Sequence, residues 1–194
     1  MSSDSSDSSG LTGLEGPWVI VALGANLGDP VAAVTDAFEA LAPFAEGPML
    51  RSPLYWSSPV DCPPGSPLFV NAVAVFRPRA GESPEAFLEA TQDLERQAGR
   101  RPKHVVNEAR PLDLDLIAWG RERRNGDRLI LPHPRAHLRR FVLAPLADLL
   151  PDGILPGQTM TVARLLEQLP ADPLLRRLEI GTGRKIPWNA GASP

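Results

Sequence analysis

Apolar residues recur along the chain in strand-like and helix-like blocks. A short apolar run over residues 18–24 ends in glycine and predicts a central strand. Residues 31–41 have apolar positions three or four apart, which predicts a helix, and Asp29 with Pro30 is a typical helix start. Similar patterns predict further strands at residues 51–57, 69–76 and 112–119, and further helices at residues 84–98, 139–150 and 161–169.

The order of these elements predicts the fold class. It reads β-α-β-β-α-β, followed by a hairpin at Asn125-Gly126 and by helices. We therefore expect an α+β fold with a ferredoxin-like split βαβ core, in which helices pack on a mixed, mainly antiparallel sheet, extended by the β-hairpin and C-terminal helices. Residues 17–180 are expected to form one domain, between a disordered Ser/Asp-rich tail at 1–16 and a loose tail at 181–194.

Composition excludes several classes of protein. No run of 18 apolar residues exists, so we expect no membrane span, and the Ser/Asp-rich start does not look like a secretory signal. The single cysteine, Cys62, fits a reducing cytoplasm, and with no histidine close by in the sequence we interpret it as a bystander thiol. The net charge of −3 speaks against nucleic-acid binding.

Two carboxylates stand in an otherwise apolar strand. Side chains alternate along a strand, so Asp113 and Asp115 point to one face and leucines 112, 114 and 116 to the other. Like charges in this position are costly unless cations or arginines compensate them. Hard oxygen ligands favour Mg²⁺, so we interpret the pair as a divalent-metal site; the alternative is an Asp-x-Asp on a solvated edge strand.

Basic residues surround this strand in the sequence. The segment 96–110 carries five cations against one acid, Glu108, and a positive loop beside metal-competent carboxylates favours a nucleoside triphosphate. A solvated basic loop is the alternative. His133 lies between two prolines at the end of a strand, a rigid position from which it can donate to a phosphate, although a structural histidine is equally compatible.

A third pattern favours a flat ligand. Phe69 and Asn71 are two apart in a predicted strand and therefore share a face. An aromatic ring beside a primary amide suits a heteroaromatic ring with hydrogen-bonding nitrogens. A core phenylalanine and an asparagine at a strand edge would produce the same pattern.

Taken together, these segments resemble hydroxymethyldihydropterin pyrophosphokinase, an enzyme of folate biosynthesis. The resemblance runs from about residue 19 to 150, and several motifs in the right order make it specific. They are Ala22-Leu-Gly-Ala-Asn-Leu-Gly-Asp29, Phe69-Val-Asn-Ala-Val73, Glu95 with Gly99-Arg100, Arg110-Pro-Leu-Asp-Leu-Asp-Leu116, and Pro132-His-Pro134 with Arg139-Arg-Phe-Val-Leu143 and Pro145-Leu146.

The resemblance implies a reaction and a set of site residues. The family transfers pyrophosphate from ATP to 6-hydroxymethyl-7,8-dihydropterin and releases AMP, so these two small molecules are the implied partners, and we expect a monomer. The implied roles are catalysis by Arg100, Arg110, Asp113 and Asp115, with the two aspartates binding two Mg²⁺ ions; ATP binding by Gln92, Glu95, Arg100, Arg110, His133 and Arg139; and pterin binding by Ser58, Pro59, Asp61, Phe69, Asn71 and Phe141.

The chain departs from the family pattern in the loop before the Asp-bearing strand. Pro102 stands where the family usually has a second arginine, and Asn107-Glu-Ala-Arg110 replaces the usual Trp-Gly-Pro-Arg. One alternative is therefore a weakened or inactive homologue that still binds pterin or nucleotide. A further hypothesis is that Arg101 or Lys103 replaces the missing arginine, which Arg101→Ala and Lys103→Ala would test through turnover.

Overall fold

The computed structural model describes residues 17–101 and 108–179 and has an α+β fold. Within them, six strands form an antiparallel sheet in the order β5-β1-β4-β3-β8, with β2 paired to β4. The elements are β1 (Val19–Ala25), α1 (Pro30–Leu41), η1 (Ala42–Phe44), β2 (Leu50–Arg51), β3 (Tyr55–Ser57), β4 (Phe69–Phe76), α2 (Pro84–Gln97), β5 (Asp113–Trp119), β6 (Arg124–Asn125), β7 (Ile130–Leu131), η2 (Ala136–Leu138), α3 (Arg140–Leu149), α4 (Val162–Gln168) and β8 (Arg176–Arg177).

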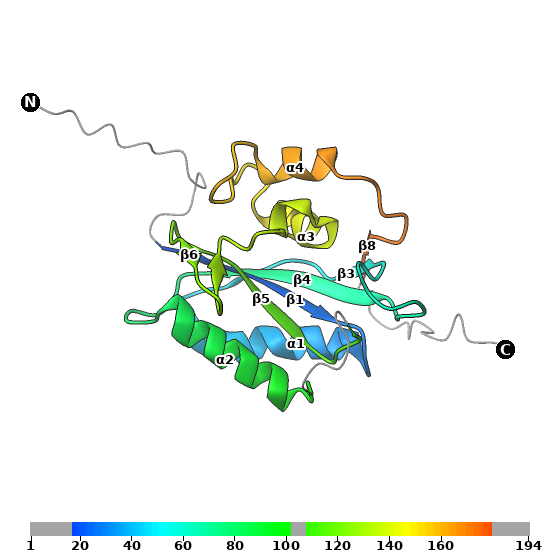
Figure 1. The fold of residues 1–194 in the computed structure, drawn as a ribbon, viewed down its shortest axis with the longest axis horizontal. Helices are drawn as coiled ribbons and strands as arrows, with labels where there is room; N and C mark the ends of the chain where they lie inside the picture. Colours follow the sequence, from blue (N-terminus) through cyan, green and yellow to red (C-terminus); the bar gives the residue numbers. More distant parts are fainter. Residues whose placement is uncertain (1–16, 102–107, 180–194) are drawn as a thin grey trace, which may run out of the picture.

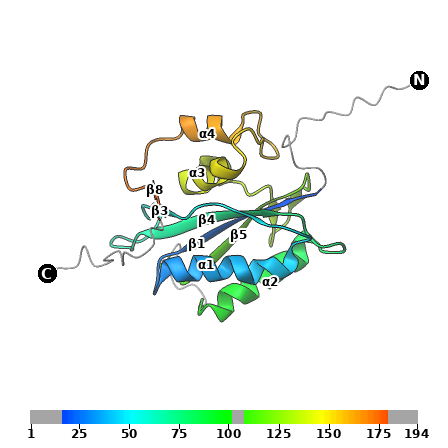
Figure 2. The ribbon, with the colours of Figure 1, turned by 180° about the vertical axis from the view of Figure 1, so that it is seen from behind.

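The sheet is the middle layer of three. Helices α1 and α2 cover one face, and α3 and α4 lie over the other (Figure 1); the reverse view shows the same layers (Figure 2). Strand β1 is central and pairs along its length with β4 on one side and β5 on the other. Because both faces are covered, β4 is buried at every position, which explains why its sequence shows little alternation.

Local sequence explains where the helices begin. Asp29 caps α1, because its Oδ1 accepts a hydrogen bond from the N–H of Ala32 at 3.0 Å. Ser83 caps α2 in the same way, accepting from Ala86 at 3.1 Å, and both helices have proline in their first turn. The predicted starts of these two helices are confirmed.

Each face of the sheet has its own apolar core. On the α1/α2 side, alternate residues of the central strands, such as Leu23, Ala72 and Leu116, pack against helix residues including Phe38 and Phe87. On the α3/α4 side the intervening residues form the second core: Ile20, Val73, Val75 and Ile117 with Val142, Leu143, Leu146, Val162 and Leu165. Strand alternation thus divides one sheet between two cores.

Two expectations about the strands were wrong. The single strand predicted for residues 51–57 is divided into β2 and β3. Between them the Ser52 hydroxyl, at 2.8 Å, accepts the Val73 N–H that a strand carbonyl would take, and Pro53 has no N–H to offer. Strand β8 was not predicted at all, because two exposed arginines carry no apolar pattern.

The predicted hairpin and the helix predicted at residues 139–150 are confirmed. The hairpin around Asn125-Gly126 forms from β6 and β7, and α3 runs through Pro145 without ending. Over the parts of the chain that the structure describes, no helix is long and apolar enough to cross a membrane. The predicted tails at 1–16 and 181–194, and Pro102, Lys103 and Asn107, lie outside the described residues.

Candidate active site

A cavity of about 280 Å³ lies over the α3/α4 face of the sheet, extends to residues of α2 and brings most of the predicted site residues together. Pro59 and Asp61 do not line it, although their neighbours Val60 and Cys62 do. Asp61 instead forms an ion pair with Arg135 at 3.6 Å. The predicted residues that line the cavity are Ser58, Phe69, Asn71, Gln92, Glu95, Arg100, Arg110, Asp113, Asp115, His133, Arg139 and Phe141.

The floor of the cavity is a row of residues across three strands. Gly24 of β1 is opposite Asn71 of β4 on one side and opposite Asp113 of β5 on the other. Ala22 is opposite Asp115. Paired residues of neighbouring strands lie side by side on one face, so the strand register alone places the amide near the carboxylates.

Three guanidinium groups bind the two carboxylates. The oxygens of Asp113 accept one hydrogen bond each from Arg100 and Arg110, both at 2.9 Å. Asp115 accepts from Arg139 at 3.3 Å. Carboxylate–guanidinium bonds are charge-assisted and strong, so these arginines supply the compensation that the two half-buried charges require.

The carboxyl group of Asp115 is nevertheless poorly stabilised as an anion. Burial raises its pKa, and the neighbouring charge of Asp113 raises it further, while Arg139, Arg110 and Arg100 oppose the shift. A bound cation would favour the ionised form. The site therefore has a physical reason to take up positive charge beyond its own arginines.

Glu95 holds Arg100 and β5 together. Its carboxylate is 7% exposed, accepts the Leu114 N–H at 2.8 Å and forms an ion pair with Arg100. Burial raises the pKa of this carboxyl, against the stabilising effect of the Leu114 N–H and Arg100. The contacts seen in the structure make Glu95 a residue that orients Arg100.

The other end of the cavity is aromatic and neutral. Asn71 is 4% exposed, and its amide nitrogen donates to the hydroxyl of Ser57 at 2.8 Å, which fixes the orientation of the amide. Cζ of Arg110 lies 5.9 Å from the ring centre of Phe69, and Cζ of Arg139 lies 5.5 Å from that of Phe141. Arg110 thus contacts both Phe69 and Asp113, and Arg139 contacts both Phe141 and Asp115.

Gly24 keeps the floor between these two ends open. A β-carbon added there would lie 3.3 Å from Oδ1 of Asn71, 3.8 Å from Cδ1 of Phe69 and 4.0 Å from Cβ of Asp113. A glycine inside a strand weakens the strand and often marks the close approach of a ligand. Sequence reasoning interpreted Gly24 only as the end of a strand and missed this role.

His133 is arranged as a neutral hydrogen-bond donor. Burial, followed by the charges of Arg139 and Arg135, lowers its pKa to about 4. Its backbone N–H donates to the carbonyl of Ile117 at 2.8 Å, and its Nδ1 accepts from the N–H of Arg135 at 3.2 Å. The ring proton therefore sits on Nε2, where it can be donated to a ligand oxygen.

The structure adds several cavity residues that sequence reasoning did not assign. Ser57, Arg135 and Cys62 are the polar ones. The thiol of Cys62 donates to the Val60 carbonyl at 3.2 Å, and burial raises its pKa, so it is a poor nucleophile at neutral pH. Two of them had a detectable signal: Ser57 precedes the proline-rich loop at the end of a strand, and Arg135 directly follows the turn Pro132-His-Pro134.

The donor atoms fit a magnesium ion bound together with phosphate. Among residues 17–101 and 108–179, no three His, Cys, Asp or Glu side chains cluster so as to hold a metal by themselves. Mg²⁺ usually keeps several waters and binds through one or two carboxylates together with substrate phosphates. Asp113 and Asp115, which share a face of β5, are the two carboxylates that such a magnesium site needs.

Comparison with known proteins identifies relatives of similar length and much longer ones. The chain is 41% identical to the 2-amino-4-hydroxy-6-hydroxymethyldihydropteridine pyrophosphokinase of Pseudomonas aeruginosa, over 71% of this chain and 83% of that protein. It is 32% identical to the Haemophilus influenzae enzyme of the same name, over 76% and 90%. It is also 34% identical to the folic acid synthesis protein fol1 of Pneumocystis carinii, over 78% of this chain but only 20% of that protein.

A solved structure supports the same grouping at the level of the fold. Wild-type Plasmodium falciparum HPPK-DHPS with SDX-DHP superposes with a TM-score of 0.57 at 13% identity, over 78% of this chain and 43% of that one. The family model of 7,8-dihydro-6-hydroxymethylpterin-pyrophosphokinase (HPPK) matches residues 20–151. The chain therefore belongs to the 7,8-dihydro-6-hydroxymethylpterin-pyrophosphokinase family.

Proposed function

We propose that the protein transfers pyrophosphate from ATP to the hydroxymethyl group of 6-hydroxymethyl-7,8-dihydropterin, giving AMP and the dihydropterin pyrophosphate in folate biosynthesis. One observation carries the proposal: a single cavity combines two arginine-bound carboxylates with two phenylalanines and a buried asparagine amide. The charged end suits a triphosphate, and the neutral end suits a flat ring with hydrogen-bonding nitrogens. Membership of the family supports the same reaction.

ATP binds at the charged end. Arg100, Arg110 and Arg139 are already collected around the aspartates and have the planar fork that suits phosphate oxygens. His133 donates its Nε2 proton to a phosphate oxygen, and Gln92 lines the same end of the cavity. Glu95 acts on ATP through Arg100, which it orients.

Magnesium is held by Asp113 and Asp115, and the proposal follows the family in expecting two ions. Such ions supply charge neutralisation for the phosphates and lower the pKa of the acceptor hydroxyl. The raised pKa of Asp115 supports a cation site, because a carboxyl that is costly to ionise alone ionises readily beside a cation.

The pterin binds at the neutral end. Asn71 presents its amide oxygen to the ring while Ser57 holds the amide nitrogen, and Phe69 and Phe141 contact the ring faces. The start of the β3–β4 loop closes this end: Ser58 and Val60 line the cavity, and Pro59 and Asp61 belong to the same loop without lining it. The chemistry then requires little from the protein beyond bringing the acceptor hydroxyl in line with the ATP phosphates and compensating charge.

The finer description of the fold is part of this proposal. The strand order β5-β1-β4-β3 is the one expected of a ferredoxin-like split βαβ core, with β8 and the β6–β7 hairpin as additions. We also propose that residues 17–180 act as one domain, because six of the described strands, from β1 to β8, join one sheet, and that the protein is a monomer.

An AMP assay tests the function. The wild-type protein with MgATP and 6-hydroxymethyl-7,8-dihydropterin should form AMP in step with dihydropterin consumption. Chelation with EDTA should stop the reaction, and added Mg²⁺ should restore it. Tight binding of an ATP analogue and of dihydropterin by calorimetry, without any AMP, would instead identify the protein as a binding homologue that has lost catalysis.

A further inference from the structure

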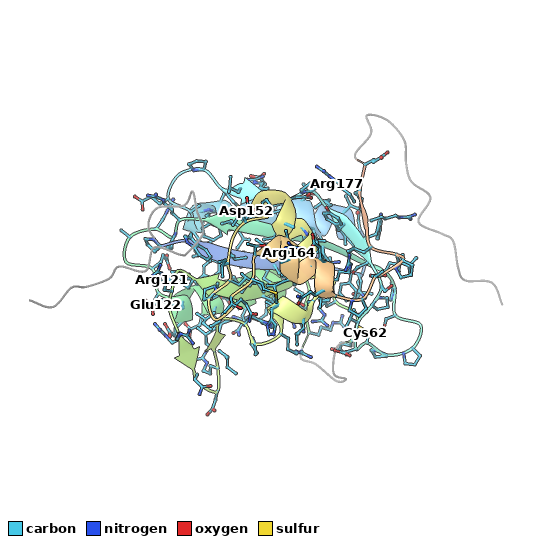
Figure 3. The ribbon with its side chains drawn as sticks, turned by 90° about the horizontal axis from the view of Figure 1, so that it is seen from above. Cys62, Arg121, Glu122, Asp152, Arg164 and Arg177 are labelled. Carbon is cyan, nitrogen blue, oxygen red and sulfur yellow. The ribbon has the colours of Figure 1, made fainter. Side chains whose placement is uncertain are left out.

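A segment near the end of the described chain runs beside the neutral end of the cavity. Residues 169–178, which we call the C-terminal strap, run from the end of α4 through β8. They lie beyond the residues 20–151 that match the family. Figure 3 shows the strap leaving α4 and reaching Arg177 at the end of the molecule where the loop that carries Cys62 also lies. Its position raises the question of what it does for the site.

The strap is anchored at both ends, next to cavity residues. At its start, Arg140 donates to the carbonyls of Leu166, Leu169 and Pro170, at 2.9, 2.8 and 3.4 Å. At its end, β8 pairs with β3, and the buried Leu178 donates its N–H to the Leu54 carbonyl at 2.7 Å. Arg140 directly precedes Phe141 of the cavity, and β3 leads directly into Ser58.

Asp172, in the middle of the strap, binds Ser58 twice. Its Oδ1 accepts from the hydroxyl of Ser58 at 2.8 Å, and its Oδ2 accepts from the Ser58 N–H at 3.1 Å. Partial burial disfavours its ionisation, but these bonds and the N–H of Leu174 outweigh it and lower the pKa of Asp172. Both bonds to Ser58 are therefore made to a carboxylate and are charge-assisted.

We propose that Asp172 is a positioning residue for the pterin end of the cavity. It fixes Ser58 and thereby the first residue of the loop that runs from β3 to β4. It also steadies the neighbouring Ser57, whose hydroxyl holds the Asn71 amide. Asp172 itself does not line the cavity, so it acts only through these residues. The inference rests on the proposed function, and its physical basis is preorganisation: a wall that is already fixed loses less freedom when the ring binds.

Substitution of Asp172 should weaken the binding of dihydropterin and leave the binding of ATP nearly unchanged. In Asp172→Ala we expect KM and Kd for dihydropterin to rise about tenfold, while kcat and the Kd of an ATP analogue stay within about twofold. Asp172→Asn keeps one acceptor oxygen and should recover part of the lost affinity. A general loss of structure would change the constants for both substrates together, and an unchanged KM for dihydropterin would overturn the inference.

Matched variants complete the experiment. Glu167→Ala removes another carboxylate from the same region, one paired with Arg164 at 3.0 Å on α4 and remote from the cavity, and should keep wild-type constants. In a double-mutant cycle, Asp172→Ala and Ser58→Ala should be non-additive in their effect on KM for dihydropterin; additive effects would show that Asp172 does not act through Ser58.

Two further experimental outcomes also test the inference. If Asp172→Ala does not fold, Ser58→Ala alone gives the test, because it removes one of the two bonds and leaves the strap in place; an unchanged KM for dihydropterin then rejects the inference. If the wild-type protein neither binds nor converts dihydropterin, the proposed function fails and the inference with it. A wild-type enzyme that is active beside an Asp172→Ala variant with normal KM rejects the inference alone.

Discussion

The two faces of the sheet are built from the same strands and differ in what their alternate residues do. On the α1/α2 side, β1, β4 and β5 present apolar residues along their whole length to one core. On the α3/α4 side they are apolar only in part, and the rest of that face carries Asn71, Gly24, Asp113 and Asp115 at the floor of a cavity. Along one strand, residues that stabilise the fold therefore alternate with residues that line the cavity. Substitutions of adjacent residues should lower stability in one case and activity in the other.

The largest effect is expected at Asp115. Asp115→Ala should lower AMP formation by more than about a hundredfold, since even residues that merely orient metal ligands are typically worth 10- to 100-fold. The thermal midpoint should stay close to that of the wild type, because the substitution also removes one of two repelling carboxylates. Turnover under saturating MgATP and dihydropterin, with calorimetric melting, measures both. Near-normal AMP release would reject the metal-binding role.

Substitution of Leu116, the residue next to Asp115, should lower stability and leave activity nearly unchanged. Leu116 is 5% exposed and belongs to the core on the α1/α2 side. Leu116→Ala should cost about 2–5 kcal/mol of unfolding free energy, because it leaves a cavity among close-packed side chains. Denaturant unfolding measures this, and kcat per folded molecule should change little. Equal losses of stability in Leu116→Ala and Asp115→Ala would contradict the separation of the two faces.

Gly24 should show an intermediate effect confined to the ring-binding end. Gly24→Ala places a methyl group 3.3 Å from Oδ1 of Asn71. We expect Kd for dihydropterin to rise about tenfold by calorimetry, whereas stability changes by less than about 1 kcal/mol, because the crowding offsets the entropic benefit of replacing glycine. Ala22→Gly, one row away beside Asp115, is the control for backbone flexibility. Unchanged dihydropterin affinity in Gly24→Ala would mean that the ring does not lie on this floor.

The smallest effect at neutral pH is expected for His133, because its titration changes stability only below about pH 6.5. Its pKa is about 4 in the folded protein, against the usual 6.5, so the unfolded chain binds the proton first as the pH falls. Stability is therefore lost between pH 6.5 and 4, and His133→Gln should lose less over that range. Urea unfolding at several pH values measures the slope. A variant that parallels the wild type down to pH 4 would show that the imidazole is not held neutral.

Local patterns were enough to predict much of the fold and the charged part of the site. Asp29 and Ser83 begin helices through bonds to residues three positions ahead, so the information lies within one turn. Asp113 and Asp115 were found because alternation along a strand is regular. The ends of β4 were predicted at Phe69 and Phe76 from a continuous run of apolar and small residues, without regular alternation.

The features that were missed depend on contacts between distant parts of the chain. Ser58 and Asp172 are 114 residues apart, and nothing in either neighbourhood indicates the other. Gly24 matters because two other strands place Asn71 and Asp113 beside it. Glu95 was assigned to ATP binding only through the family resemblance, and its burial depends on meeting Leu114 of β5. Register and packing between elements decide these roles.

Strand β5 lies at one edge of the sheet, and two of its outward-facing backbone groups are already bound. Exposed edges with unpaired N–H and C=O groups are templates on which other molecules add strands and aggregate. Here the N–H of Leu114 is bound by Glu95, and the carbonyl of Ile117 by the N–H of His133. Two residues proposed to serve ATP therefore also occupy part of this edge, and we expect substitution of Glu95 to lower solubility as well as turnover.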